Sequence, residues 1–282
     1  MPVVRYQNYR GESVTLHGDG ISFMDLNSLR SYKWDFSTSN RPNGMGGIAS
    51  NFARKPIQKS IQIGSHTGTL AALHELENRI HAVTEPDIIA NEPGKLYVGD
   101  QYISCYAVSG TPEDYVKAGH FVQLELGLLV VEPYWCTETT SVFNIDTSTQ
   151  YDTTAKTFNL RFPYRFATGF ANSKLNNLHY AECPMIITIY GPAQNPSLII
   201  AGNTYNVETQ IATGSRLVID QTKHTIDLVN SVGQKTSVFN SRNKAYDIFK
   251  PLPVGESLVQ HAGEFKFAIS VIQQRSGMRW TD

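Results

Sequence analysis

The seven residues VQLELGL, from Val122 to Leu128, alternate between apolar side chains and polar or small ones. Successive side chains of a strand point to opposite faces, so this period of two predicts a strand with one face on a core and the other in water. The same alternation occurs in residues 32–36 (YKWDF) and 265–271 (FKFAISV). The chain is therefore predicted to be mainly β, with Tyr32, Trp34 and Phe36 on a buried face.

Short turn sequences between apolar runs predict antiparallel hairpins. Gly99-Asp100 separates KLYV from QYISCYAV, and Gly202-Asn203 separates SLIIA from TYNVETQ. A glycine first in a two-residue turn supplies the positive φ of a type II′ turn. A third hairpin, with the longer loop QTKH, is predicted between residues 216–220 and 225–229.

One amphipathic helix is predicted over residues 69–84. Its apolar positions follow one another at steps of three or four, which places them on one stripe of a helix; they are Leu70, Leu73, Leu76, Ile80 and Val83. Ser65, Thr67 and Thr69 are candidate caps. Pro86 is expected to end the helix, because the residue before a proline is restricted away from helical geometry.

Two domains are predicted, of residues 1–137 and 138–282. Length alone favours two, and residues 137–157 are rich in Thr, Ser and Asp, as linkers and strand edges are. The first domain is expected to be mostly strand with the single helix laid on it, and the second to be formed entirely of strands. Residues 38–56 lack periodicity and are predicted to be a long loop, the kind that is functional or held by a partner.

Composition excludes several classes of protein. A net charge of −1 with 41% hydrophobic residues argues against disorder and against a strongly basic nucleic-acid binder. No apolar run approaches the ~20 residues of a membrane span, and the first residues have no signal-peptide pattern. Cys105, Cys136 and Cys183 are expected to be buried thiols in a reducing compartment, most simply the cytoplasm.

No catalytic, cofactor or metal site is predicted. The nucleophile-elbow, phosphate-loop and dinucleotide motifs are absent from the sequence. His74 and His81 are seven residues apart on the predicted helix. Two histidines alone do not make a metal site, so both are expected to flank the apolar stripe of that helix. Arg161 and Arg165 alternate with aromatic residues, and inward-facing aromatics are favoured there over a platform that stacks nucleic-acid bases. Tryptophans are expected in the core rather than in a sugar site.

A series of short motifs extends along nearly the whole chain. They are SYKW (31–34), RKP (54–56), GKLYV (94–98), YISC (102–105), EPYW (132–135), IYGP (189–192), NP (195–196), LVID (217–220), FKPLPVG (249–255) and RSGMRW (275–280). In this order they resemble the distal tail protein family of bacteriophages with long, non-contractile tails.

The resemblance implies a structural protein of the virion tail tip, assembled in the host cytoplasm, and no enzyme. It implies a homohexameric ring between the tail tube and the tip hub, with its tail-associated lysin and receptor-binding proteins. DNA would pass through the lumen without sequence recognition. The first domain would be a β-sandwich with the single helix, and the second a galectin-like β-sandwich on the outside of the ring. A galectin sugar site needs His-x-Asn-Pro-Arg, whereas Gln194 and Ser197 flank Asn195-Pro196 here. A carbohydrate-binding module for the host surface stays the alternative, and a cell-wall hydrolase is a third hypothesis.

Overall fold

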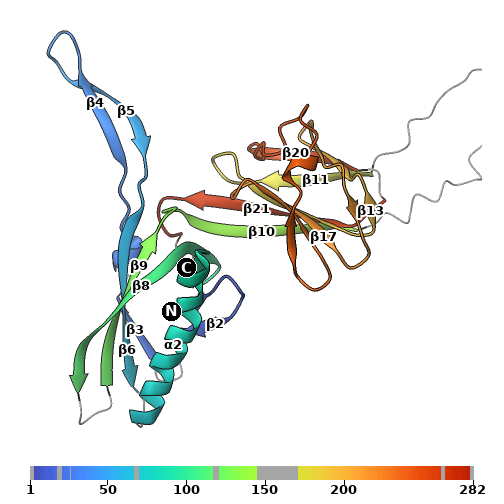
Figure 1. Cartoon of the computed structure of the whole chain (residues 1–282). Coiled ribbons are helices and arrows are strands. Elements are labelled where there is room, and N and C mark those ends of the chain that lie inside the picture. Colours follow the sequence, from blue (N-terminus) through green and yellow to red (C-terminus); the bar gives the residue numbers. More distant parts are fainter. Residues whose placement is uncertain are drawn as a thin grey trace, which may run out of the picture. The chain divides into compact units, whose positions relative to one another are not determined.

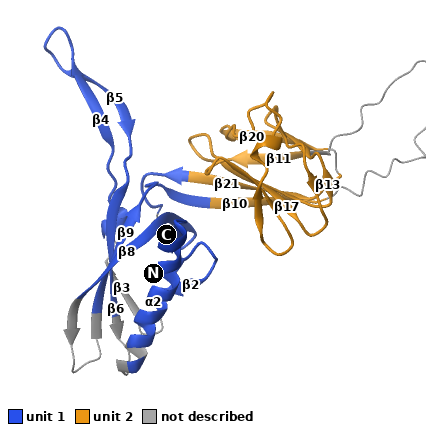
Figure 2. Ribbon diagram, viewed as in Figure 1, with its two compact units in different colours: residues 1–137, 274–282 blue, residues 138–273 orange. Residues whose placement is uncertain are grey.

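The structure is a computed structural model, and it describes residues 3–17, 21–25, 27–66, 70–116, 121–144, 171–261 and 264–279. The chain divides into two compact units. Unit 1 comprises residues 1–137 and 274–282, and unit 2 comprises residues 138–273 (Figure 2). The sequence assigns residues 274–279 to the second domain, whereas the structure places them in unit 1.

Unit 1 contains most of the helical residues. Its elements are β1 (Val4–Gln7), β2 (Ser13–Thr15), β3 (Ile21–Asp25), α1 (Asn27–Arg30), β4 (Asp35–Asn40), β5 (Gly47–Ala53), β6 (Ile57–His66), α2 (Leu70–Ala90), β7 (Gly94–Val98), β8 (Gln101–Val116), β9 (Phe121–Val130) and the start of β10 (Trp135–Phe143). The last residues of β21 (Phe267–Arg275) also belong here, so the chain crosses between the units in β10 and again in β21.

The long strand β8 belongs to two sets of paired strands in unit 1. Its first residues pair with β7, which continues to β1 and β2. Its later residues pair with β9, which continues to β6 and β3. The predicted strand 122–128 lies within β9, and its Leu126 and Leu128 are buried in the unit 1 core together with Ile61 and Ile63 of β6. The period-two prediction is confirmed there.

Helix α2 is longer than the sequence predicts. It runs from Leu70 to Ala90 and includes Pro86, which was expected to end it (Figure 1). Two buried polar residues hold the last turns: the Thr84 hydroxyl donates to the carbonyl of Ile80 at 3.0 Å, and Asp87 accepts two hydrogen bonds from residues of the N-terminal segment. The two tertiary hydrogen bonds to Asp87 outweigh the donor that a proline removes from a helix.

Unit 2 is a sandwich of two antiparallel sheets. Its further elements are β11 (Ala171–Asn177), β12 (Met185–Tyr190), β13 (Ala193–Gln194), β14 (Ser197–Ile200), β15 (Asn203–Asn206), β16 (Gln210–Ile211), β17 (Arg216–Asp220), β18 (Thr225–Val229), β19 (Lys235–Ser237), the 3₁₀ turn η1 (Phe239–Ser241) and β20 (Gly255–His261). One sheet has the order β10-β21-β12-β17-β18-β19, and the other has the order β11-β20-β14-β15.

The unit 2 core lies between these sheets. Phe267 and Ile269 of β21 meet Ile187 of β12 from one sheet, and Leu198 of β14 and Val259 of β20 come from the other. All five side chains are fully buried. The structure therefore confirms the strand that the alternation in residues 265–271 predicts, together with its buried face.

Two of the three predicted hairpins form as expected. Gly99 has φ 66° between β7 and β8, and β17 pairs with β18 across the loop 221–224. In the third hairpin the turn residues are Ala201 and Gly202, with φ 49° and 75°, rather than Gly202-Asn203. Positive φ at both central residues defines a type I′ turn, so the predicted register was wrong by one residue.

The three cysteines are buried free thiols, as predicted. Burial raises the pKa of the Cys105 thiol to about 12, so it stays protonated and unreactive at neutral pH.

Candidate assembly surfaces

Strands β4 and β5 form a hairpin where the sequence predicts a loop. They pair only with each other, and the hairpin projects from the rest of unit 1 (Figure 1). Its apolar side chains are exposed: Phe36 by 59%, Met45 by 78%, Ile48 by 55% and Phe52 by 61%. The unpatterned loop expected over residues 38–56 is therefore corrected to a two-stranded arm with an apolar surface.

The arm has a defined geometry. At its tip Arg41 accepts a hydrogen bond from the Gly44 amide and donates one to the Gly46 carbonyl, and both glycines have φ near 70°. Near its base the register shifts between Asp35 and Ser37, opposite Asn51 at φ 55°. Such a bulge increases the twist of a strand pair.

The predicted buried face of residues 32–36 is also corrected. Strand β4 begins only at Asp35, and Tyr32, Trp34 and Phe36 are exposed by 58%, 38% and 59%. The rings of Phe36 and Phe52 lie 6.0 Å apart across the arm. An apolar alternation left largely exposed by the described residues is typical of a surface buried on assembly.

Arg54 lies at the base of the arm. Its guanidinium carbon is 5.6 Å from the centre of the Trp34 ring and 4.8 Å from that of Tyr134. Its Nη2 donates to the carbonyl of Ser276 at 3.4 Å. Burial lowers the pKa of this guanidinium below its usual value. A cavity of about 240 Å³ lies beside it, lined also by the basic residues Lys33, Lys55 and Lys59.

A buried carboxylate anchors α2 to the N-terminal strand. The Tyr6 hydroxyl donates to Oδ2 of Asp87 at 2.7 Å, and the amide of Tyr9 donates to Oδ1 at 2.8 Å. Asp87 is fully buried, and desolvation raises its pKa. A Cβ at Gly94 would collide with both Asp87 and Tyr6, so only glycine fits there. This group supports unit 1 rather than forming an accessible site.

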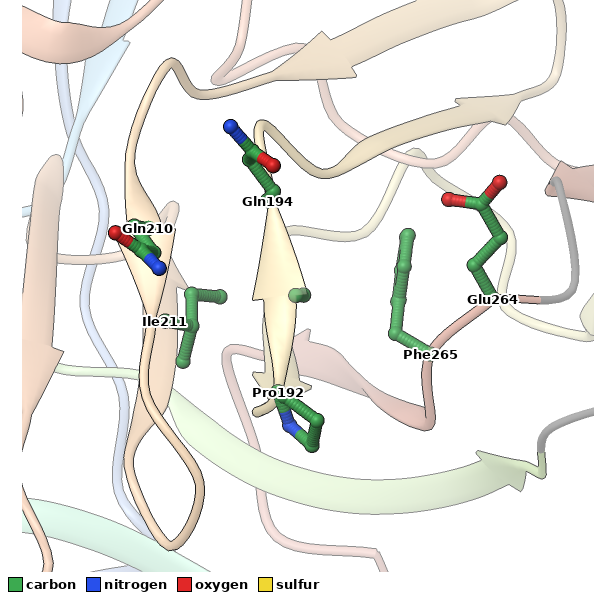
Figure 3. Close-up of a pocket in the computed structure, with 7 residues that line it drawn as sticks. Pro192, Gln194, Gln210, Ile211, Glu264 and Phe265 are labelled. Carbon is green, nitrogen blue, oxygen red and sulfur yellow. The ribbon is translucent and has the colours of Figure 1, made fainter.

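Unit 2 has a separate shallow pocket of about 290 Å³ (Figure 3). Figure 3 shows the Gln194 amide and the Glu264 carboxylate at one end and Pro192 at the other. Phe265 is the aromatic residue among those lining it, and it is only 5% exposed. Stacking on a sugar ring requires an accessible aromatic face, which this pocket does not offer.

The remaining candidates from the sequence do not come together as a site. His74 and His81 are exposed on α2, and no cluster of metal-ligating side chains occurs in the part of the chain that the structure describes. Arg161, Arg165, Trp280, Thr67 and Thr69 lie outside the described residues. None of the described helices is both long and apolar enough to span a membrane.

The sequence matches no protein-family model and no curated protein. Solved structures are similar over almost the whole chain. The structure of SPP1 Dit (gp 19.1), described as a paradigm of the hub adsorption apparatus in phages that infect Gram-positive hosts, has a TM-score of 0.57 at 10% identity. A chain of the phage P2 baseplate in its activated conformation with Ca has a TM-score of 0.63 at 10% identity, as does one with Sr. Each comparison covers 98% of this chain and 99% of the other.

These likenesses define the class of fold: a two-unit β architecture shared with hub and baseplate chains of phage tails. In particular, the chain has the fold of a Dit-like phage tail protein. The expected mainly β fold with one long helix is confirmed. Arg54 belongs to the RKP motif, to which the sequence assigns no role, and the exposed apolar residues Met45 and Phe52 are not predicted from the sequence. The only available signal for these two was apolar residues in a segment with strand-like flanks.

Proposed function

We propose that this protein is a structural component of a bacteriophage tail tip, forming a homohexameric ring that joins the tail tube to the tip. The observation that carries the proposal is the β4–β5 arm, whose apolar side chains are left exposed by the part of the chain that the structure describes. The fold, shared over 98% of the chain with phage hub and baseplate proteins, supports the same role.

A closed ring of identical subunits needs one surface that meets a different surface on the next copy. The arm supplies the first of these surfaces and lies on the adjacent subunit. Fully burying a large apolar side chain stabilises by about 1.5–3 kcal/mol. Phe36, Met45, Ile48 and Phe52 are each more than half exposed, so covering them would contribute about 4–7 kcal/mol for each arm.

The wider assembly follows from this role. One face of the ring would meet the tail tube protein, and the other would meet the tip hub with its tail-associated lysin; receptor-binding proteins would attach outside. Residues 1–137, together with residues 274–282, would form the ring-building domain, and residues 138–273 a galectin-like domain on its periphery. DNA would pass through the lumen without sequence recognition. The protein would act in the virion, after assembly in the host cytoplasm, and would not be an enzyme.

The first test is the absolute mass in solution, by light scattering behind a sizing column at two protein concentrations. Six copies of the 31.4 kDa chain give about 188 kDa. A stable monomer, also when the tail tube protein and tip hub are added, would overturn the proposal.

A second test concerns the arm itself. Deleting residues 43–47, or combining Phe36→Ser with Phe52→Ser, is expected to abolish the ring and leave the melting temperature of the subunit unchanged. Val232→Ser is the matched control, because Val232 is 90% exposed in a turn of unit 2. An intact ring of unchanged stability after either arm change would show that the arm does not join subunits.

A further inference from the structure

The cavity at the base of the arm contains a cation with no counter-charge. The Nε and Nη1 atoms of Arg54 have no contact with solvent and no hydrogen-bond partner. The carboxylate in the cavity lining is that of Asp35, and it pairs with Lys55 at 3.3 Å instead. Arg54 as a whole is partly exposed and its Nη2 bonds to Ser276, but charged nitrogens that do not touch water are normally matched by an acceptor or an anion, because leaving them unpaired is costly.

The other basic groups of the lining are already engaged or face water. Lys59 is 5% exposed, and its Nζ donates to the carbonyls of Ser28 at 2.6 Å and Ser31 at 2.7 Å. Lys33 is exposed at the rim. The cavity is therefore positively charged, and Arg54 is the member whose buried nitrogens lack hydrogen-bond partners.

We propose that this cavity is a binding site for a carboxylate, supplied by an Asp or Glu side chain of the adjacent copy in the ring. The inference rests on the proposed function. The occupant is assigned to a second copy because the cavity lies where the arm begins and ends, at Asp35 and Arg54, so that a copy lying along the arm also reaches its base. Arginine is the residue best suited to pair with a carboxylate in a partly desolvated interface.

The carboxylate makes the Arg54 charge favourable only in the assembled state. In the free subunit the unpaired cation is a cost to stability, whereas in the ring it becomes half of an ion pair. This reversal of sign distinguishes the proposal from a purely structural role, in which stacking on Trp34 and Tyr134 would stabilise the free subunit as well.

The test compares Arg54→Met, which removes the charge and keeps an apolar stem, with the wild type. Losing one member of a buried charge pair raises the dissociation constant of an interface by about 30-fold or more. We expect that increase for the ring in a dilution series followed by mass photometry, with the melting temperature of the diluted subunit equal to or above that of the wild type. Arg54→Lys is expected to recover most of the assembly. Arg5→Met, which removes a cation stacked 4.6 Å from the centre of the Tyr97 ring, is the matched control and should leave the ring unchanged.

Carbodiimide cross-linking identifies the partner carboxylate. The reagent joins an amine to a carboxylate in direct contact. Lys55 already pairs with Asp35 of its own chain, so Lys33 is the amine at the cavity that should be coupled to an Asp or Glu of the adjacent copy. In rings assembled from a mixture of ¹⁴N- and ¹⁵N-labelled chains, that cross-linked peptide pair should contain both isotopes.

The outcomes separate the two proposals. If the wild type forms no ring, the proposed function fails. If the ring forms and Arg54→Met leaves its dissociation unchanged, or if Arg54→Met lowers the melting temperature of the free subunit, the carboxylate site is refuted while the ring stands. Cross-links from Lys33 confined to a single chain would refute it as well.

Discussion

The Tyr6–Asp87 hydrogen bond is expected to be a principal support of unit 1, and Tyr6→Phe tests it with the smallest possible change. The substitution removes one hydroxyl and leaves Oδ2 of a fully buried carboxylate without its donor. A buried acceptor that loses its partner costs about 1–3 kcal/mol, and more when it is charged, so a loss of about 3 kcal/mol is expected. With a urea m-value of about 2 kcal/mol/M, the unfolding midpoint should fall by about 1.5 M.

Tryptophan fluorescence provides the assay, because Trp34 and Trp135 lie in unit 1 and residues 138–273 contain no tryptophan. Tyr9→Phe is the control: it removes a hydroxyl that is bonded to Arg10 on a side chain 41% exposed, and it should cost less than about 0.5 kcal/mol. If Tyr6→Phe shifts the midpoint no more than Tyr9→Phe does, the Tyr6 hydroxyl does not stabilise the buried carboxylate and the reasoning fails.

Three further predictions concern the same unit. Burial raises the folded-state pKa of Asp87, so the free energy of unfolding should fall as the pH rises from the ordinary carboxyl pKa to the raised one, and stay level above it. Asp87→Asn should remove this pH dependence, which urea titrations between pH 3.5 and 7 would reveal. Gly94→Ala should cost about 3 kcal/mol in the urea midpoint, since its Cβ would collide with Asp87 and Tyr6. Lys59→Met should cost about 2 kcal/mol by thermal melting, because the carbonyls of Ser28 and Ser31 would lose their buried donor; an unchanged melting temperature would refute this.

The sequence was most informative where burial within the chain decides the structure. Residues 122–128 and 265–271 have an alternation that the two cores require, and their strands form as predicted. The same rule failed for Tyr32, Trp34 and Phe36, because a periodic pattern does not reveal whether the covering surface belongs to the same chain. The arm itself was hidden by three glycines near its tip and by the bulge at Asn51, which breaks the period of two.

Local rules failed where tertiary contacts opposed them. Pro86 is a helix breaker by its own chemistry, but the buried Asp87 ties the turn around it to Tyr6 and Tyr9 of the N-terminal segment. Ala201 adopts a left-handed φ that alanine disfavours, and its amide bonds to the carbonyl of Leu258 on β20. The Arg54 cavity could not be inferred from sequence, because its members come from separate segments that meet only in the folded unit.

The double crossing of the chain between the units has a consequence for biosynthesis. The side chain of Gln101 exchanges two hydrogen bonds with the backbone of Arg279, at 2.6 and 2.7 Å, so unit 1 is completed by residues that are synthesised after all of unit 2. Unit 2 is fully synthesised before those residues appear, and domains generally fold as units during synthesis. The arm-bearing unit is therefore finished only after unit 2 has been synthesised, so translation products that stop within unit 2 would lack this closing contact and would be poorly suited to enter an assembly.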